Sequence, residues 1–527
     1  MQRYMAAASI LCAFSLLGML YLQKLSVVTT PETNIMSKTF RLSSWRQPNG
    51  SIDFEMITKS ENFVISVVKP RPVHRVGKQL SIKIVAMDSR GRPKSYGGDF
   101  IRTKLYSRSP VEASTAGRVT DHGDGTYTAT FFLSFPGTLS VSVKLVHPSE
   151  AVQALKKFRD GSIVRRVMVC GFQEKTNVTE WMFCSNTPNK SLNLRDVCDF
   201  SRPLVNVTFY CDRPRFSPCD SFVGCHRDHS STLAMHDKMA TADEKKLFPR
   251  DRDLLEDLPR NMSIRVKGKR LLRKVRGKPL PLCAPRLPQT ASEGYWFNGN
   301  WTSLRCKAGK FRTVESVTEC LRNKTLFFRG DSTIRQWFRY LMLFLKLQQH
   351  GRGSQPVYAI DEKNNIKFHF LFHNYPRNQM PLMDGKDMGY VAEEIDGIVG
   401  GKDVVILISL WAHFSAEPIQ TFRSRLYGIR HAIERLHSRH PETKIIWRSP
   451  NTGHHQQFQH FVENGDWYAF QLLPVVYEIL GDLNISIINV WEMSESMWHN
   501  DDMHPPDDVI KNHVDMLLSY ICPFNNG

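Results

Sequence analysis

The sequence lacks several patterns that would fix its chemistry at once. None of its 11 cysteines stands in a CxxC pair, which argues against a zinc ribbon and against a dithiol redox site. The cluster His454, His455 and His460 has no spacing that suits a metal ion, so we predict no metal site. Acidic residues are fewer than basic ones: the sequence has 51 Asp and Glu and 70 Lys and Arg, which gives a formal net charge of +19. A surface of this sign favours acidic partners, which are nucleic acid, anionic membrane or acidic glycan.

The N-terminal segment, residues 1–24, decides between these partners. Tyr4–Leu22 carries no charged residue and is long enough for a signal peptide or a membrane anchor, and no clear small-x-small cleavage site follows it. We leave cleavage and anchoring open and favour both over a buried core helix. Since Arg3 would stay on the cytosolic side, the remaining chain would lie in the lumen. That location excludes nucleic acid and limits membrane contact to the N-terminal segment.

Sequons and cysteines agree with a lumenal chain. Cys12 lies in the apolar run, and the other ten cysteines are an even number, as full disulfide pairing requires. The sequence does not reveal which cysteines pair. All eight Asn-x-Ser/Thr sequons follow the apolar run, at Asn49, Asn177, Asn189, Asn206, Asn261, Asn300, Asn323 and Asn484. We therefore expect a glycoprotein of the secretory pathway, either in the Golgi lumen or secreted.

The length of 527 residues predicts two or three domains. Residues 55–160 show short alternating apolar patterns and predict an all-β sandwich. The glycine-rich turn Asp121–Tyr127, together with Pro136-Gly137, resembles the repeat signature of filamin-type immunoglobulin-like domains. Asp121 and Asp124 offer carboxylates for calcium, but in a glycine-rich turn we favour a turn-forming role for both.

Residues 161–320 hold nine of the ten cysteines beyond the apolar run and predict a disulfide-stapled, loop-rich region with a small core. Within this region, residues 260–278 carry nine Lys or Arg and no acid, which predicts an exposed linker. Three interpretations of this linker stay open. It is a solvated loop, a contact for acidic glycans, or a cleavage site for a basic-specific protease at Lys269-Arg270 or Arg273-Lys274.

Residues 321–527 alternate between strand-like and helical patterns. The most regular helical patterns are Ile419–His437 and Trp467–Leu480. The predicted strands are Thr325–Arg329, Lys367–His373, Val404–Leu410, Lys444–Trp447 and Ile485–Val490. Five strands with helical crossovers predict a parallel, doubly wound α/β sheet. In such a sheet the active site lies beyond the carboxyl ends of the strands.

Ser332 follows the first of these strands, in Gly330-Asp331-Ser332, and a run with helical spacing begins there. At a helix N-terminus, backbone N–H groups and the helix dipole would stabilise the oxyanion that forms during acyl transfer. Gly330 permits the tight turn before it. On this motif alone, a helix cap is the commoner interpretation.

Asp501 and His504 lie near the other end of the chain. Their spacing of three puts both side chains on one face of a helical turn, so the carboxylate can hold the imidazole tautomer. Of the 19 histidines, only His504 has an aspartate at this spacing, and the GDS tripeptide also occurs once. One motif after the first strand and one after the fifth together predict a triad of Ser332, His504 and Asp501. Asp502 is the nearest alternative to Asp501.

From Thr325 to Cys522 the chain resembles the PC-esterase branch of the GDS and SGNH hydrolase-like fold, which includes polysaccharide and sialic-acid O-acetyltransferases. The preceding region looks like neurexophilin, through Cys170-Gly171-Phe172, Trp181–Cys184, Asp196–Phe200 and Tyr210-Cys211. The chain is thus similar to the neurexophilin and PC-esterase domain family over nearly its whole length. The resemblance implies a multi-domain protein: an immunoglobulin/filamin-like β-sandwich, a cysteine-rich neurexophilin-like region, and a doubly wound α/β domain of SGNH/GDSL type at residues 321–527.

The resemblance also implies roles for individual residues. Ser332 would be the nucleophile, His504 the base and Asp501 its partner. The oxyanion or substrate site would include Gly330, Asp331 and Arg335 of the GDSxxR pattern. The chain departs from the SGNH pattern because Ser409–Phe414 replaces the G-x-N-D block, so the usual asparagine donor is missing and Arg335 or His413 would substitute. Three residues that follow strands either line a sugar site or pack in the core: Trp411, Arg448 and Asn451.

The leading functional prediction is transfer of an acetyl group from acetyl-CoA to a glycan hydroxyl through an acyl-serine. Sialic acid on glycoproteins or mucins is the favoured acceptor by resemblance, and an acidic glycan suits a basic protein. A carbohydrate O-acetylesterase is the runner-up, because the same triad hydrolyses the acyl-enzyme when water reaches it. A third prediction is a non-enzymatic secreted ligand for a neurexin-like receptor. The sequence does not reveal the hydroxyl position or the oligomeric state.

Overall fold

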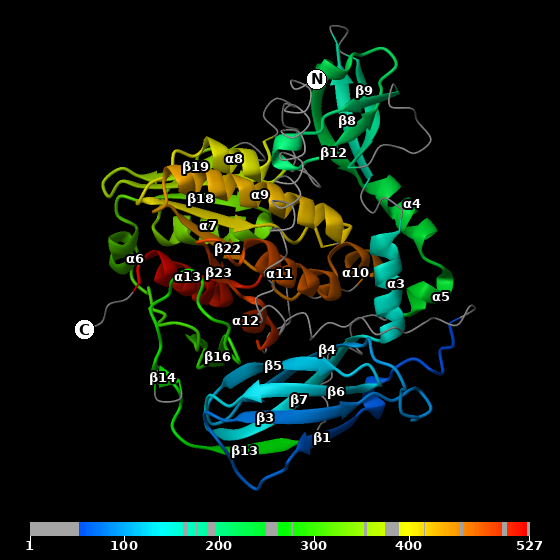
Figure 1. The fold of residues 1–527 in the computed structure, drawn as a ribbon, viewed down its shortest axis with the longest axis vertical. Helices are drawn as coiled ribbons and strands as arrows, with labels where there is room; N and C mark the ends of the chain where they lie inside the picture. The colour runs from blue at the N-terminus through cyan, green and yellow to red at the C-terminus, as the bar shows by residue number, and fades with distance from the viewer. Residues whose placement is uncertain are drawn as a thin grey trace, which may run out of the picture. The chain divides into compact units, whose positions relative to one another are not determined.

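The structure, a computed structural model, describes residues 52–161, 167–174, 178–186, 196–248, 262–272, 274–275, 278–351, 356–374, 389–415, 417–453, 455, 457–497 and 503–523. These residues form a mixed α/β protein with sheets of ten, five and six strands (Figure 1). A small hairpin adds β14 (Lys274–Val275) and β15 (Lys278–Pro279). The N-terminal segment and its predicted signal or anchor lie outside the described residues.

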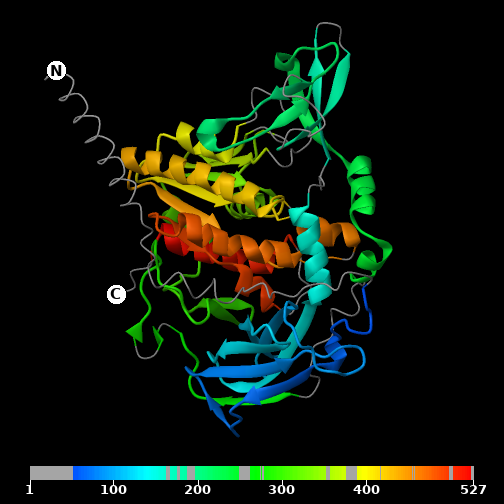
Figure 2. The same cartoon turned by 45° about the vertical axis from the view of Figure 1, so that its right-hand side comes forward.

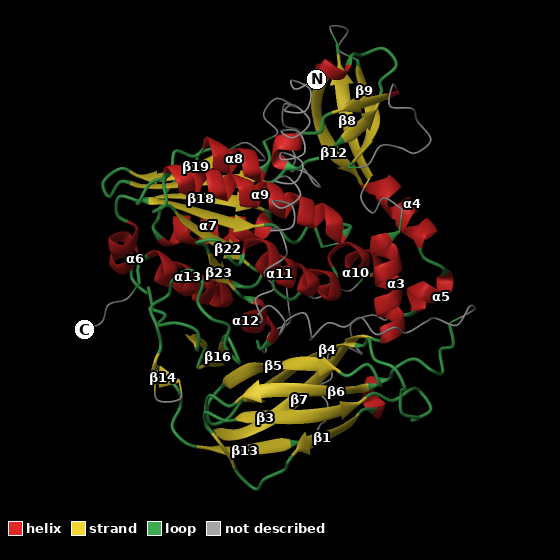
Figure 3. Cartoon of the chain, in the orientation of Figure 1, coloured by secondary structure: helices red, strands yellow, loops and turns green. Residues whose placement is uncertain are grey.

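The ten-stranded sheet occupies most of the N-terminal part, which Figure 3 shows almost entirely as strands. Its strands are β1 (Val64–Val68), β2 (His74–Arg75), β3 (Gln79–Val85), β4 (Phe100–Ser107), β5 (Ala113–Asp121), β6 (Thr126–Phe132), β7 (Gly137–His147), β13 (Ser263–Lys267), β16 (Gly294–Phe297) and β17 (Asn300–Ser303). Strand β5 pairs with β4 through its first half and with β6 through its second half, so it joins two halves of the sheet. Alternate residues of both halves, such as Ile82 and Val143, are fully buried in one shared core.

Strand β13 corrects the prediction of an exposed linker at residues 260–278. Ser263–Lys267 pairs antiparallel with β7 and parallel with β2. Ile264 and Val266 are buried in the core of the N-terminal sheet, while Arg265 and Lys267 point to solvent. The high net charge of residues 260–278 led us to predict an exposed linker. A strand needs only alternate apolar residues to bury one face, and Ile264 and Val266 supply them. The boundary drawn at residue 161 therefore separates a strand from its own sheet.

In the Asp121–Tyr127 turn, Asp121 and Asp124 have the turn-forming role that we favoured from the sequence. Asp121 accepts hydrogen bonds from the backbone N–H groups of Gly98 and Gly123, at 2.7 and 2.8 Å. Asp124 accepts one from the N–H of Thr126 at 2.9 Å. Both carboxylates therefore close the turn with the backbone, as short acidic side chains do in such loops.

The five-stranded sheet carries three of the five disulfides. Its order is β10 (Val197–Asp199), β11 (Tyr210–Asp212), β9 (Thr179–Ser185), β8 (Val167–Gln173) and β12 (Phe222–Asp228). The disulfides of the chain are Cys170–Cys225, Cys184–Cys211, Cys198–Cys219, Cys283–Cys306 and Cys320–Cys522. All ten cysteines beyond Cys12 are therefore paired. Disulfides at this density indicate folding in an oxidising compartment.

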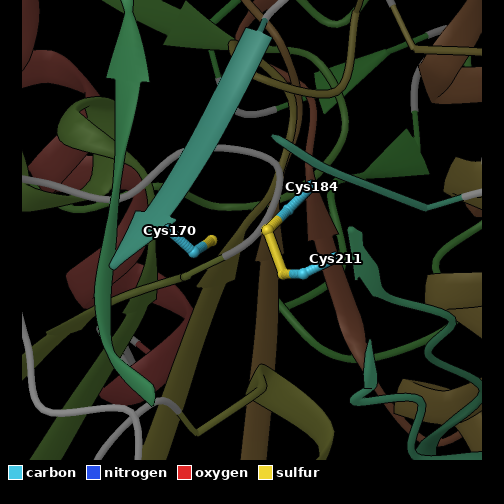
Figure 4. Close-up of side chains that lie close together, drawn as sticks. All are labelled: Cys170, Cys184 and Cys211. Carbon is cyan, nitrogen blue, oxygen red and sulfur yellow. A yellow bond between two sulfur atoms is a disulfide. The ribbon is translucent and has the colours of Figure 1, made fainter. Parts of the chain in front are cut away.

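Three cysteines lie close enough to suggest a metal cluster. The sulfur atoms of Cys170, Cys184 and Cys211 fall within 4.8 Å of one another. Figure 4 shows the bond between Cys184 and Cys211, and Cys170 is bonded to Cys225. Because metal binding by cysteine requires the thiolate, these oxidised sulfurs are not a metal site.

Short helices connect the sheets. They are α3 (Ser149–Asp160), α4 (His229–Met239), α5 (Ala242–Lys246) and α6 (Val314–Leu321), with single 3₁₀ turns at Ser60–Asn62, Pro203–Val205 and Cys219–Ser221. Helix α3 contacts the C-terminal part, since the Tyr468 hydroxyl donates to the Leu155 carbonyl at 2.6 Å. None of the helices within the described ranges has the length and apolar character needed to cross a bilayer.

The six-stranded sheet carries the GDS motif. Its order is β19 (Val357–Asp361), β20 (Ile366–Phe372), β18 (Thr325–Gly330), β21 (Val404–Ser409), β22 (Lys444–Arg448) and β23 (Ser486–Ile488). All neighbours pair in parallel except β19, which is antiparallel to β20. The five predicted strands are all present, and β19 is an additional edge strand. Strand order reverses at β18, which is the switch point where such sheets bind ligands.

Helices cover both faces of this sheet, as Figures 1 and 2 show. They are α7 (Ser332–Phe344), α8 (Val391–Gly397), α9 (Ile419–Arg439), α10 (Phe458–Asn464), α11 (Asp466–Leu480), α12 (Trp491–Glu495) and α13 (Asp507–Ile521). Alternate residues of β21 divide between two cores. Ile406 packs in the core that contains α8, α9 and α11, and Leu407 packs in the core that contains α7 and α13.

Candidate active site

The turn between β18 and α7 places Ser332. Gly330 ends β18 with a φ of 147°, and a Cβ atom there would lie 1.9 Å from the Ser409 carbonyl oxygen. Only glycine allows this approach to β21. Asp331 is the N-cap of α7, because its side chain accepts from the N–H of Thr333 at 2.9 Å. Ser332 is therefore the first residue of the helix, at the carboxyl end of β18.

His504 meets Ser332 at this position. The Nε2 atom of His504 lies 2.8 Å from the Oγ atom of Ser332, although 172 residues separate them. His504 is exposed and lies two residues before Pro506, the N-cap of α13. A hydroxyl and an imidazole at this distance form a nucleophile and its general base in acyl-transfer enzymes.

The predicted third member of the triad lies outside the described residues. Asp501 and its alternative Asp502 both fall in the range 498–502, so their placement relative to His504 stays a prediction. Asp507, the first residue of α13, is the acidic residue that the structure places in the pocket with His504. It was not among the sequence candidates.

A pocket of about 660 Å³ opens beside the pair. Of the described residues, those that line it are Ser332, Arg335, Gln336, Arg339, Tyr340, Leu343, Phe344, His504 and Asp507. All but two lie on one face of α7, at helical spacing from Ser332. Volumes of this size are typical of small-molecule sites.

Arg335 lies in this pocket, one turn after Ser332, and the oxyanion or substrate role that the resemblance implied for it stays a prediction. Partial burial and the nearby charge of Arg339 lower the pKa of Arg335. Two guanidinium groups that repel each other beside one carboxylate, Asp507, leave positive charge in excess. The pocket is therefore suited to an anionic substrate.

Asp331 has a structural role, which differs from the substrate role that the resemblance implied. Its side chain is fully buried and is absent from the pocket lining. One carboxylate oxygen accepts from Thr333, and the other accepts from the backbone N–H groups of Trp411 and Ala412, at 3.2 and 3.0 Å. Because a buried charge must be hydrogen-bonded, Asp331 fastens the start of α7 to the loop after β21.

Arg448 completes this buried network. Its guanidinium donates to Thr333 Oγ1 at 3.0 Å and to Asn451 Oδ1 at 2.5 Å. Burial lowers the pKa of Arg448 to about 10, and the charge of Asp331 opposes that shift. Asn451 in turn donates to the carbonyl of Met503 at 3.4 Å, one residue before His504. Arg448, Asn451 and Trp411 are buried and bonded to this network, so they pack and do not line a sugar site.

His413 does not reach the pocket lining formed by the described residues. It is buried, and its Nδ1 atom lies 2.8 Å from Nε2 of His373. The ring of His413 also packs against Phe372, with centroids 5.5 Å apart. The structure therefore gives no geometric support to an oxyanion role for His413.

The N-terminal sheet holds the segment that leads toward His504. Trp296 Nε1 donates to the Met493 carbonyl at 2.8 Å, and Ser114 Oγ donates to the Ser496 carbonyl at 2.5 Å. Arg118 forms an ion pair of 2.9 Å with Glu492. The predicted domains are thus not independent, because the first sheet anchors α12 and the residues after it.

Four of the eight sequons fall within the described residues. Asn300 and Asn484 are exposed, and Asn206 and Asn323 lie in left-handed turns with φ of 60° and 61°. These turn positions are surface conformations that asparagine tolerates. The other four are Asn49, Asn177, Asn189 and Asn261, and they lie outside the described residues.

Sequence reasoning missed most of the pocket lining. It identified Ser332, Arg335 and His504 but not the remaining residues of α7 or Asp507. A signal was present, since residues 3, 4, 7, 8, 11 and 12 positions after a helical nucleophile share its face. It also missed Arg448 as a partner of the serine helix, because that contact joins residues 115 positions apart.

Comparison with known families agrees with this architecture. A family model described as "NXPE family member 4-like, C-terminal domain" matches residues 301–522. The neurexophilin family model matches residues 47–233, which include most of the N-terminal sheet as well as the five-stranded sheet. The two matches follow one another along the chain without overlap. This chain belongs to the family of neurexophilin and PC-esterase domain proteins.

Proposed function

We propose that the protein is a glycan O-acetyltransferase that transfers an acetyl group to a sugar hydroxyl, with sialic acid on glycoproteins as the acceptor. Family membership fits an acyltransferase or esterase type of enzyme. The observation that carries the proposal is the distance of 2.8 Å between Ser332 Oγ and His504 Nε2. The serine stands at the N-terminus of a helix, at the switch point of a parallel sheet.

The first half-reaction forms an acetyl-serine. His504 Nε2 accepts the proton of Ser332 as its Oγ atom attacks the carbonyl carbon of an acetyl thioester, for which acetyl-CoA is the proposed donor. The carbon–sulfur bond then breaks, and His504 returns the proton to the departing sulfur. The N–H of Ser332, in the first turn of α7, has no partner within the helix and points to the oxyanion. Arg335 adds positive charge beside it.

The second half-reaction releases the product. A sugar hydroxyl gives its proton to His504 and attacks the acetyl carbonyl of the serine ester. The ester bond to Ser332 breaks, and the serine oxygen recovers the proton from His504. Asp501 is the proposed carboxylate that holds the imidazole in the productive tautomer.

The proposal also includes the fold type of the two largest sheets and the cellular compartment of the protein. We assign the N-terminal sheet to an immunoglobulin/filamin-like sandwich, because β5 crosses between two halves over one core. The six-stranded sheet is assigned to the SGNH type, since its parallel strands follow the order β20, β18, β21, β22, β23. The proposed compartment is the Golgi lumen or the cell exterior, which the five disulfides favour.

Expression of wild type and Ser332→Ala in cells, followed by mass measurement of released sialic acids, tests the proposal. Wild type should raise the acetylated fraction, and Ser332→Ala should leave it at the level of untransfected cells. Equal acetylation with both proteins would overturn the transferase. Loss of existing acetyl groups with wild type alone would instead establish an esterase, because exposed His504 is open to water as well as to a sugar hydroxyl.

A secreted ligand is the second candidate function. The five-stranded sheet and its loops expose large apolar side chains, including Trp181 at 45% and Phe216 at 77%. Exposed aromatic residues are enriched at protein interfaces. A pull-down of a neurexin-type ectodomain by wild type, lost in Trp181→Ser, would support this function. Binding that persists in that variant would remove this surface from consideration.

A further inference from the structure

The pocket beside Ser332 is longer than the chemistry requires. Its lining extends along α7 from Ser332 to Phe344, which are the first and last residues of the helix. Twelve steps at a rise of about 1.5 Å per residue span roughly 18 Å. An acetyl group and one sugar hydroxyl need only the end near Ser332. The remaining length is therefore not needed by the acetyl group or by the hydroxyl that receives it.

The far end of the pocket is aromatic. Tyr340 and Phe344 lie four residues apart, and their rings are nearly parallel, with an angle of 16° and centroids 6.0 Å apart. Both rings pack in part against the core beneath α7 and remain partly exposed in the pocket. The core contacts hold the rings in one orientation, so binding would cost little side-chain entropy.

A cation lies beside the aromatic pair, on the side that faces Ser332 along α7. Arg339 is exposed and lines the pocket two helical turns after Ser332. Within the described part of the chain, neither Arg339 nor Arg335 forms an ion pair. Asp507 is the one carboxylate among the described lining residues, so the pocket keeps a net positive charge.

We propose that Arg339 and the ring pair Tyr340–Phe344 form an extended acceptor subsite, which binds the sugars next to the acetylated one in an anionic glycan chain. This inference rests on the proposed function. The negative face of an aromatic ring attracts the polarised C–H groups on one face of a sugar ring. Arg339 adds charge-assisted hydrogen bonds to carboxylate or hydroxyl oxygens of the chain. The enzyme would then select acceptors by length as well as by charge.

Two other occupants fit the groove less well. A long acyl chain needs an enclosed apolar tunnel, but Leu343, next to Phe344 at the far end of the lining, is 62% exposed. The phosphates of acetyl-CoA would also meet arginine. However, its long pantetheine arm would carry them beyond Arg335 and Arg339, which follow Ser332 by only one and two turns.

Binding to purified Ser332→Ala protein tests the subsite without catalysis. The probes are a sialylated trisaccharide, free sialic acid and CoA, with affinity from calorimetry and sugar contacts from saturation-transfer NMR. Tyr340→Leu with Phe344→Leu should weaken trisaccharide binding about tenfold and remove the signals of the inner sugars, while free sialic acid binds as before. Arg339→Gln should weaken the trisaccharide in the same way.

Matched controls separate this effect from general damage. The control for the ring pair is Tyr358→Leu, because Tyr358 stacks on His350 at 5.1 Å on another part of the same domain. The control for Arg339 is Arg322→Gln, at an exposed site. Neither control should change trisaccharide affinity. Phe344→Tyr keeps the ring and should keep binding, provided that the melting temperature is unchanged.

Three results would overturn the subsite. They are unchanged trisaccharide affinity in the double variant, equal loss for free sialic acid, and a loss confined to CoA. The test is independent of the proposed reaction. If wild type transfers no acetyl group but trisaccharide binding depends on Tyr340 and Phe344, the reaction is wrong and the subsite holds.

Discussion

Gln336 donates a hydrogen bond of 2.6 Å from its Nε2 atom to the backbone carbonyl of Pro505. Gln336 lies one turn after Ser332 on α7, and Pro505 directly follows His504. The bond therefore ties helix α7, which begins at Ser332, to the loop that carries His504. Gln336 also lines the pocket, so a split between kcat and KM is needed to separate positioning of His504 from contact with substrate.

Replacement of Gln336 by methionine keeps the length of the side chain but removes the donor. We expect kcat to fall about tenfold with little change in KM, because a lost bond of about 1.4 kcal/mol loosens the Ser332–His504 distance. The same substitution at Gln349, an exposed residue that donates to the Gly351 carbonyl at 3.3 Å, is the control. Equal kinetics for Gln336→Met and Gln349→Met would show that the bond has no positioning role.

Arg448 provides a stability prediction. It is buried beneath α7, and Asp331 is the charge that favours its ionised form. Arg448→Met removes that cation. The Asp331 carboxylate then keeps only its hydrogen bonds from Thr333 and from the backbone N–H groups of Trp411 and Ala412. We expect the free energy of unfolding to fall by about 3 kcal/mol, measured by urea titration, because the buried Asp331 carboxylate loses a nearby opposite charge and Thr333 and Asn451 lose a buried donor. Arg322→Met, at an exposed site, should cost less than about 0.5 kcal/mol.

His147 makes the stability dependent on pH. Burial lowers the pKa of this histidine to about 3, and its ring packs on Phe100, Phe248 and Phe461. Between about pH 6.5 and 3 the unfolded chain binds a proton that the folded chain does not, so stability falls as the pH falls. His147→Phe removes this contribution and should reduce the acid-side loss by up to about 1.4 kcal/mol per pH unit below 6.5.

Urea titrations of His147→Phe and wild type at pH 7 and pH 5 measure this difference. His350→Phe is the control, because His350 is exposed and should titrate alike in both states. A wild-type slope that persists unchanged in His147→Phe would assign the acid sensitivity to other groups.

The disulfide Cys320–Cys522 closes a loop of 202 residues and ties α6 to the end of α13. Chain entropy predicts a stabilisation of about 5 kcal/mol for a loop of this length. The same relation gives about 3.4 kcal/mol for Cys283–Cys306, whose separation is 23, so Cys320→Ser with Cys522→Ser should destabilise the protein by about 2 kcal/mol more than Cys283→Ser with Cys306→Ser. Calorimetry of the two double variants decides this, and equal losses would contradict the loop-length argument.

The strands of the six-stranded sheet were predictable because each is a short, nearly continuous apolar run between helical patterns. The predicted Thr325–Arg329 and Val404–Leu410 correspond to β18 and β21 within one residue at one end. Edge strand β19 was missed, since it is only five residues long and three of these are exposed or partly exposed. Strand β13 was missed for a related reason, because its basic residues dominate the composition while its two apolar residues alone determine the buried face.

The sequence by itself determined the chemistry available to this protein. It contains one GDS motif, one aspartate–histidine spacing after the last strand, and an even set of cysteines beyond the apolar segment. Tertiary structure alone decided which of these groups meet. Parallel strands bring their carboxyl ends to one edge whatever the length of chain between them, and so Ser332 and His504 come into contact. The pocket lining, the Arg448 contact and the disulfide partners were likewise set by packing between distant segments, which local patterns do not encode.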